Sequence, residues 1–269
     1  MADLTCPAAR AALCLDLIAL DPGLGGLAIR ARQGPVRAAV LERLDRLPLP
    51  RTRLHPQVSD ETLFGGLDLA ATLARGRIVQ EAGLLAEPSA LVLAMAERVP
   101  ASLTARLASC LDHNRGHVLI ALDEGANEDE VCPAPLIDRM AFHVDLSEVP
   151  ISALQNFDRP DIDAARQRLS QTPVTVDLHR QAAELALAFG IDSLRAPLFL
   201  LGTARALGAL WDRPVDAEIV QTACALTLAH RATRMPETDM PEEPPEDSPP
   251  DPPSESQESN GESLDIPQE

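Results

Sequence analysis

The chain contains no lysine: all 23 of its basic residues are arginine. Lysine is the side chain that forms Schiff bases, acts as an amine base and contacts phosphates in a P-loop, so none of these chemistries can come from this chain alone. Tyrosine is also absent, aromatic residues make up 2%, and Trp211 is the single tryptophan. The core must therefore consist of Leu, Ala, Val and Ile, which suits helices and buried parallel strands better than an antiparallel sandwich.

The sequence also lacks a basic surface, a long apolar run and paired cysteines. Its net charge is −18, and twelve acidic residues at 236–269 leave −6 for the rest, which excludes electrostatic binding to nucleic acid. No apolar run approaches the roughly 20 residues of a membrane span, and the first residues do not form a signal peptide. Five scattered cysteines indicate reduced thiols and a cytoplasmic location.

Hydrophobic periodicity divides the chain into residues 1–152, 153–235 and 236–269. The first part alternates strand-like apolar runs with helical patterns, which is typical of a parallel sheet covered by helices. The second part carries only helical patterns. The third holds nine prolines and twelve acidic residues, so it cannot bury enough apolar surface to fold. We therefore expect an α/β layer, an all-helical layer and a disordered linker.

The individual elements follow from the same periodicity. Apolar runs predict strands at residues 26–31, 52–56, 90–95, 117–122 and 142–146. Helical spacing predicts helices at residues 7–21, 36–46, 67–75, 101–113, 133–140, 161–169, 177–188, 193–210 and 216–231. Each of the last four begins at an Asp or Ser that can cap it. Residues 77–85 combine a β-like pattern with a glycine and predict a hairpin.

The loop after the first strand lies where a P-loop would lie. A functional loop reads G-x-x-x-x-G-K-[ST], in which the lysine contacts phosphates and the hydroxyl holds Mg²⁺. Here Val36 stands at the lysine position, Arg37 stands at the hydroxyl position, and Pro35 removes one backbone donor. Arg32 and Gly34 complete this degenerate motif. Taken alone, the segment is equally an ordinary strand-to-helix turn.

The strand at 90–95 runs into Ala96-Glu97, where a Walker B strand would end in Asp-Glu. The missing Asp would organise Mg²⁺ and the Glu would orient water. Glu97 is therefore either a residual Walker B carboxylate or a solvated carboxylate at a strand end. Further along, Leu136-Ile137-Asp138-Arg139 and Ser193-Leu194-Arg195 each end in an arginine. Two degenerate Walker motifs followed by these arginines resemble the order of elements in AAA+ ATPases.

Further segments make the resemblance more specific. Phe64–Asp68 and Glu81–Ala86 look like the G-x-L-D and P-G-L-L-A stretches of magnesium chelatase AAA+ subunits. Residues 136–139 resemble that family's L-L-D-R arginine-finger motif, and residues 193–207 resemble its sensor 2 helix. The similarity runs through most of residues 10–234. Degenerate motifs and the acidic linker resemble the non-motor type of subunit, although the integrin-type D-x-S-x-S motif of that type is absent.

This resemblance implies an AAA+ type three-layer core at 1–152, a helical lid subdomain at 153–235 and a linker at 236–269. It implies a ring complex with the motor (I) subunit that drives Mg²⁺ insertion into protoporphyrin IX, which is held by a third, large porphyrin-binding (H) subunit. ATP and Mg²⁺ would lie at an interface with the motor subunit. Hydrolysis by this chain itself is not expected, while the sequence leaves open whether the chain binds nucleotide. Arg139 would be an arginine finger offered in trans, and Arg195 the sensor 2 contact.

Several alternatives stay open from the residues alone. In one, the chain is an autonomous ATPase in which Arg32 or Arg37 replaces the lysine. In another, the chain is a scaffold of another ATPase complex, and its own acidic tail docks a partner. Cys110, His113 and His117 have a zinc-like spacing, but they span a helix and a strand, so we expect no metal site. Asp123 stands either at the sensor 1 position or in a solvated acidic loop.

Overall fold

The computed structural model describes residues 4–113, 116–127, 129–154, 157 and 159–234, all within one compact unit of residues 1–236. The expectation of a disordered linker at residues 236–269 lies outside the described residues.

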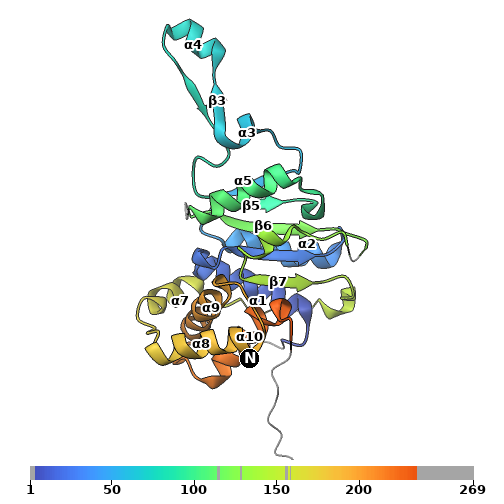
Figure 1. Ribbon diagram of the computed structural model, residues 1–269, viewed down its shortest axis with the longest axis vertical. Coiled ribbons are helices and arrows are strands. Elements are labelled where there is room, and N and C mark those ends of the chain that lie inside the picture. Colours follow the sequence, from blue (N-terminus) through green and yellow to red (C-terminus); the bar gives the residue numbers. More distant parts are fainter. Residues whose placement is uncertain (1–3, 114–115, 128, 155–156, 158, 235–269) are drawn as a thin grey trace, which may run out of the picture. The chain divides into compact units, whose positions relative to one another are not determined.

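A five-stranded sheet forms the centre of this unit (Figure 1). Its strands are all parallel and lie in the order β2-β5-β6-β1-β7. Their bounds are Gly26–Arg30 (β1), Arg51–Leu54 (β2), Ala90–Leu93 (β5), Val118–Asp123 (β6) and Phe142–Asp145 (β7). The sequence predicted all five strands to within a few residues. Because the strands are parallel, their carboxyl ends lie at the same edge of the sheet, where ligands bind in open α/β folds.

Alternate residues of β1 divide the core into two layers. Leu27 and Ile29 belong to the apolar cluster that contains α1 (Pro7–Leu20) and the carboxyl-terminal helices. Ala28 belongs to the cluster on the other face, which contains α5 (Ala101–Asp112). The two-residue period of a strand therefore places helices on both faces, as the expected three-layer core requires. Shorter helices are α2 (Pro35–Leu41), α3 (Asp60–Phe64) and α6 (Ala134–Ile137), with 3₁₀ turns at Pro22–Leu24, Glu42–Arg46, Ala96–Arg98, Ile151–Ala153 and Ala229–Arg231.

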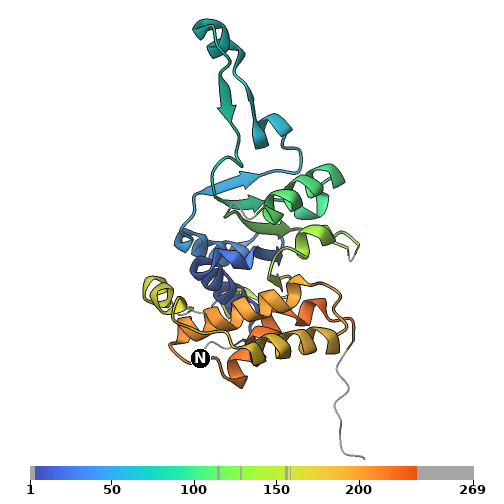
Figure 2. The ribbon, with the colours of Figure 1, turned by 60° about the vertical axis from the view of Figure 1, so that its left-hand side comes forward.

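Four helices follow the sheet: α7 (Ile162–Leu169), α8 (Val176–Ala188), α9 (Arg195–Trp211) and α10 (Ala217–Thr227). The central α9 contacts the other three, and the group lies against α1 and β7 (Figures 1 and 2). Asp161 and Asp216 cap α7 and α10 as predicted. The other two predicted caps are wrong, because Thr175 caps α8 and α9 begins after Leu194 with no side-chain cap.

The predicted hairpin is present, but its partner strand lies earlier in the chain. Strand β3 (Gly65–Leu67) pairs with β4 (Gln80–Ala82), and α4 (Leu69–Arg75) lies between them in sequence. The predicted helix 67–75 begins two residues late because Asp68 is its cap and accepts the N–H of Ala71 at 2.8 Å. In both ribbon views this hairpin lies at the end of the unit opposite α7–α10.

Candidate functional site

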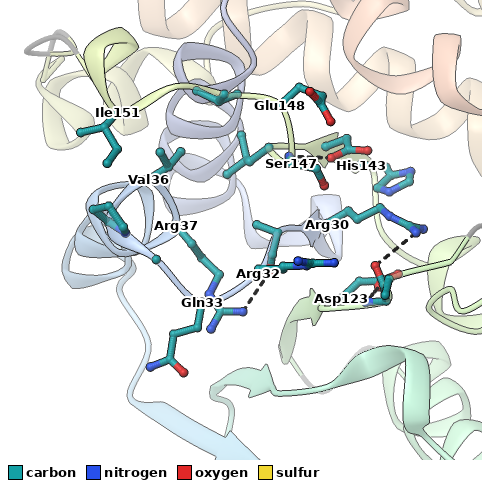
Figure 3. A pocket seen from close by; sticks show the side chains of 18 residues that line it. Arg30, Arg32, Gln33, Val36, Arg37, Asp123, His143, Ser147, Glu148 and Ile151 are labelled. Atoms are coloured by element: carbon teal, nitrogen blue, oxygen red, sulfur yellow. Dashed lines mark hydrogen bonds between the residues drawn. The ribbon is translucent and has the colours of Figure 1, made fainter.

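The carboxyl ends of β1, β6 and β7 border a pocket of about 830 Å³ (Figure 3). One wall is the loop between β1 and α2, and Ser147 and Glu148 lie across the pocket from it. All four residues of the degenerate P-loop line this pocket: Arg32, Gly34, Val36 and Arg37. The structure therefore brings the predicted loop to the edge of the sheet where a nucleotide site would lie.

Arg37 is buried in the wall of the pocket and forms an ion pair with the partly exposed Glu124. Its Nη1 donates to the carbonyl oxygen of Ala31 at 3.0 Å and to Oε1 of Glu124 at 2.6 Å. The Arg37 side chain is 9% exposed and that of Glu124 is 32% exposed. The charge of this arginine is therefore neutralised by the protein itself, at the sequence position where a P-loop hydroxyl would hold Mg²⁺.

Glu97 holds Glu124, the ion-pair partner of Arg37, in place. Its Oε2 accepts the backbone N–H of Glu124 at 2.9 Å, and its side chain is 3% exposed. The alternative of a solvated Glu97 is therefore wrong, and a residual Walker B role for this residue stays a prediction. Because its oxygen already accepts a backbone hydrogen bond, Glu97 acts here as a structural link between the end of β5 and the loop after β6.

The residues of this pocket do not fit a Mg²⁺–nucleotide complex. Val36 offers no charge and packs against the apolar core. Ala96, at the position of the Mg²⁺-organising Asp, is buried and offers no oxygen. The guanidinium of Arg30 donates to the carbonyl oxygens of Asn127 at 2.7 Å and Gly125 at 3.3 Å. The pocket thus keeps its position while its phosphate- and metal-binding groups are replaced.

Asp123 is not part of a solvated loop. The side chain lies at the end of β6, is 3% exposed, and accepts the N–H of Gly125 and that of Cys132, each at 2.8 Å. Both carboxylate oxygens therefore hold the loop that follows β6. This arrangement also positions Glu124, which follows Asp123 directly.

Arg139 and Arg195 lie together on a different part of the molecule and share one carboxylate. Arg139 donates from Nε at 2.9 Å and from Nη2 at 2.5 Å to the two oxygens of Asp112. Arg195 donates from Nη2 to Oδ1 of Asp112 at 2.9 Å and from Nη1 to Oδ2 of Asp138 at 2.7 Å. The hydroxyl of Ser193 also donates to Asp138. We call Arg139, Arg195, Asp112 and Asp138 the arginine face.

The arginine face joins three elements distant in sequence. Asp112 ends α5, Arg139 follows α6, and Arg195 begins α9 in the helical region. Neither arginine lines the pocket after β1. Sequence reasoning identified both arginines but missed Asp112 and Glu124, the carboxylates that bind Arg139 and Arg37. In the sequence, each is marked only by its place at the end of a predicted helix or strand. Acidic residues are common at such places on solvated surfaces, so this pattern does not identify a binding residue.

The residues with zinc-like spacing are separated by the fold. His117 is buried, and its Nδ1 accepts the N–H of Ser89 at 3.2 Å. His113 and Cys110 instead line a shallow cavity beside Phe64. Across the part of the chain that the structure describes, no group of three His, Cys, Asp or Glu residues could hold a metal ion. Nor does any helix among the described residues have the length and apolarity to cross a membrane.

Sequence comparison relates the chain to subunits of one enzyme. Over 241 residues it is 44% identical to the magnesium-chelatase 60 kDa subunit of Cereibacter sphaeroides, covering 88% of this chain and 43% of the relative. The Rhodobacter capsulatus 60 kDa subunit is 44% identical over 238 residues, covering 84% and 41%. The chain thus spans less than half the length of these relatives. The magnesium-chelatase 38 kDa subunit of R. capsulatus is 24% identical, covering 83% of this chain and 85% of the relative.

Two further comparisons bear on the fold. The AAA lid domain family matches residues 179–252. The structure of a suspected ATPase from Cytophaga hutchinsonii superposes with a TM-score of 0.62 at 16% identity, covering 81% of this chain and 80% of the other. The expected fold class, an AAA+ type parallel-sheet core followed by a helical lid, is confirmed.

Proposed function

The chain belongs to the AAA+ subunits of magnesium chelatase, of the 60 kDa type, and from that membership we propose that it is the platform of a metal-inserting ATPase complex. It assembles into a ring with the ATP-hydrolysing motor (I) subunit. The complex inserts Mg²⁺, as substrate, into protoporphyrin IX held by the large H subunit, in the cytoplasm and for (bacterio)chlorophyll synthesis. Residues 1–152 are the degenerate core, 153–235 the lid and 236–269 the linker.

The placement of the arginines is the observation that supports this proposal. The pocket after β1 has its arginine paired internally, whereas Arg139 and Arg195 lie side by side, away from that pocket. In AAA+ rings, an arginine of one subunit stabilises the charge that develops on the terminal phosphate held by its neighbour. Arg139 is the finger of this proposal, and Arg195 links the lid to the same phosphate.

The proposal assigns no ATP hydrolysis to the chain itself. ATP and Mg²⁺ are held by the motor subunit at the shared interface. An autonomous ATPase would need Arg32 or Arg37 to replace the lysine. Arg32 is exposed on the loop, while Arg37 is buried and bound to Glu124. A planar guanidinium also does not reproduce the compact ammonium group of a P-loop lysine.

The test is the ATPase rate of the complex reconstituted from this chain and a motor subunit with intact Walker motifs. Arg139→Ala should lower the rate and the metal insertion that depends on it, since a trans arginine is worth roughly 10³-fold or more in related phosphoryl transfers. Arg106→Ala is the matched control, because Arg106 lies on α5 and pairs with Asp60 at 2.8 Å. It should leave the rate unchanged.

The same experiment separates the proposal from a pure scaffold or adaptor. A scaffold whose acidic tail docks the partner predicts full activity with Arg139→Ala and loss of assembly when residues 236–269 are deleted. Retained ATPase activity in an Arg139→Ala complex that still assembles would rule out the finger role.

A further inference from the structure

Three N–H groups of the arginine face converge on the carboxylate of Asp112. They are Nε and Nη2 of Arg139 and Nη2 of Arg195, at 2.5 to 2.9 Å from its oxygens. Guanidinium groups arranged in this way bind an oxyanion through parallel, charge-assisted hydrogen bonds, and a phosphate satisfies this geometry as well as a carboxylate does. The arrangement is therefore that of an anion site whose occupant is a side chain of the same protein.

Each arginine also has an anchor that does not depend on Asp112. Nη1 of Arg139 donates to the carbonyl oxygen of Pro135 at 2.7 Å. Nη1 of Arg195 donates to Asp138, which in turn accepts the hydroxyl of Ser193. If the Asp112 carboxylate moved away, these anchors would still hold both guanidinium groups, and the released N–H groups would face a common point.

Asp112 itself is a replaceable occupant. It is the last residue of α5, where the helix dipole disfavours a negative charge. Its side chain is 38% exposed, so solvent and a competing anion can reach it. Hydrogen bonds from Arg139 and Arg195 lower its pKa, and the carboxylate is therefore ionised at neutral pH. A terminal phosphate carries more negative charge than one carboxylate and would gain more from the two guanidinium groups.

We propose that Arg139 and Arg195 form a polyphosphate-binding site that the Asp112 carboxylate masks in the free chain. The terminal phosphate of a nucleoside triphosphate replaces Asp112 on the released N–H groups, while Pro135 and Asp138 keep the arginines in place. That the phosphate is presented by a neighbouring subunit rests on the proposed function. The masked anion site itself rests only on the contacts within this chain.

The test is the binding of inorganic tripolyphosphate to the full chain, measured by isothermal titration calorimetry at low salt and pH 7.5. Asp112→Asn should bind about tenfold more tightly than the unaltered chain, because the competing charge is gone. The double variant Asp112→Asn/Arg139→Ala should lose this gain. Asp60→Asn, which removes the partner of Arg106 elsewhere on the surface, is the matched control and should leave the affinity unchanged.

Unchanged affinity in a folded Asp112→Asn chain would overturn the proposal, as would a gain that survives Arg139→Ala. Circular dichroism checks folding, and Asn is well tolerated at a helix end. The two proposals fail separately. A higher affinity for tripolyphosphate with Asp112→Asn, together with an unchanged ATPase rate of the complex with Arg139→Ala, would support the anion site and exclude the finger role. An unchanged affinity with Asp112→Asn, together with a lowered ATPase rate of the complex with Arg139→Ala, would support the finger role and exclude masking by Asp112.

Discussion

The pocket after β1 and the arginine face both pair arginine with carboxylate, but they differ in how accessible the pair is. In the pocket, the Arg37 side chain is 9% exposed, and Glu97 fixes the backbone of its partner Glu124. On the arginine face, the side chains of Arg139 and Arg195 are 18% and 40% exposed, and the Asp112 that they share is about as exposed as Glu124, at 38% against 32%. The first pair is part of the wall of the core, whereas the second lies where another molecule can compete for it.

Burial therefore determines what each arginine can do. Separating a buried pair leaves a desolvated charge without a partner, whereas an exposed pair exchanges with water and ions at little cost. The pocket arginine is thus part of the packed fold, while the carboxylate that the face arginines share is open to solvent. The degenerate P-loop and the arginine face are accordingly separate features of this chain.

The largest expected difference between the two regions is in stability. Arg37→Ala should lower the free energy of unfolding by about 2 kcal/mol, because it removes a buried guanidinium together with its hydrogen bonds to Glu124 and to the carbonyl oxygen of Ala31. Arg139→Ala should lower it by about 1 kcal/mol or less, since Asp112 keeps its hydrogen bond from Arg195. Urea unfolding followed by circular dichroism measures both. Equal losses would contradict the assignment of one pair to the core and the other to the surface.

Acidification should affect the partly buried histidines His143 and His230, whose ring centroids lie 5.7 Å apart, more than the ion pairs of the arginine face. Burial lowers the pKa of His230 to about 3 and lowers that of His143, which lines the pocket. The folded state thus resists protonation, and stability present above the unfolded-state pKa of about 6.5 is lost as the pH falls toward 3. His230 alone should account for a loss of about 2 kcal/mol between pH 7 and pH 5. Asp112, whose pKa is lowered, stays ionised over that range.

Urea unfolding at pH 7 and pH 5 tests this. His230→Phe keeps the ring but removes the titration, so it should flatten the pH dependence of stability. His179→Gln is the control, since His179 is exposed on α8 and its replacement should leave the slope as it was. A slope unchanged by His230→Phe would mean that His230 does not carry the pH dependence.

The smallest effect concerns Glu97. Glu97→Gln keeps an oxygen for the N–H of Glu124 and should change stability by less than about 0.5 kcal/mol, whereas Glu97→Ala should cost about 1 kcal/mol. Neither variant should alter the ATPase rate of the reconstituted complex. A reduced rate with Glu97→Gln would identify this residue as a working Walker B carboxylate and would make the pocket more than a structural feature.

The local hydrophobic pattern was enough to predict most of the helices and strands, but not every helix cap or the pairing of strands. Continuous apolar runs identified β5 and β6, because strands buried on both faces need such runs. The predicted caps of α8 and α9 failed because several polar residues stand near each helix start. The hairpin at Gln80–Ala82 was expected, but its pairing with Gly65–Leu67 depends on residues separated by a helix. Pairing between distant segments leaves no mark in local periodicity.

The sequence by itself determined what the chain cannot do. Without lysine, and with Val36, Arg37 and Ala96 at three motif positions, it has no complete P-loop or Walker B site, because those chemistries require particular atoms. Only the tertiary structure decided which arginines remain available. Arg37 is neutralised by Glu124, and Arg139 meets Arg195 at Asp112, because the fold brings distant carboxylates to these positions and buries Arg37 more deeply than Arg139 and Arg195.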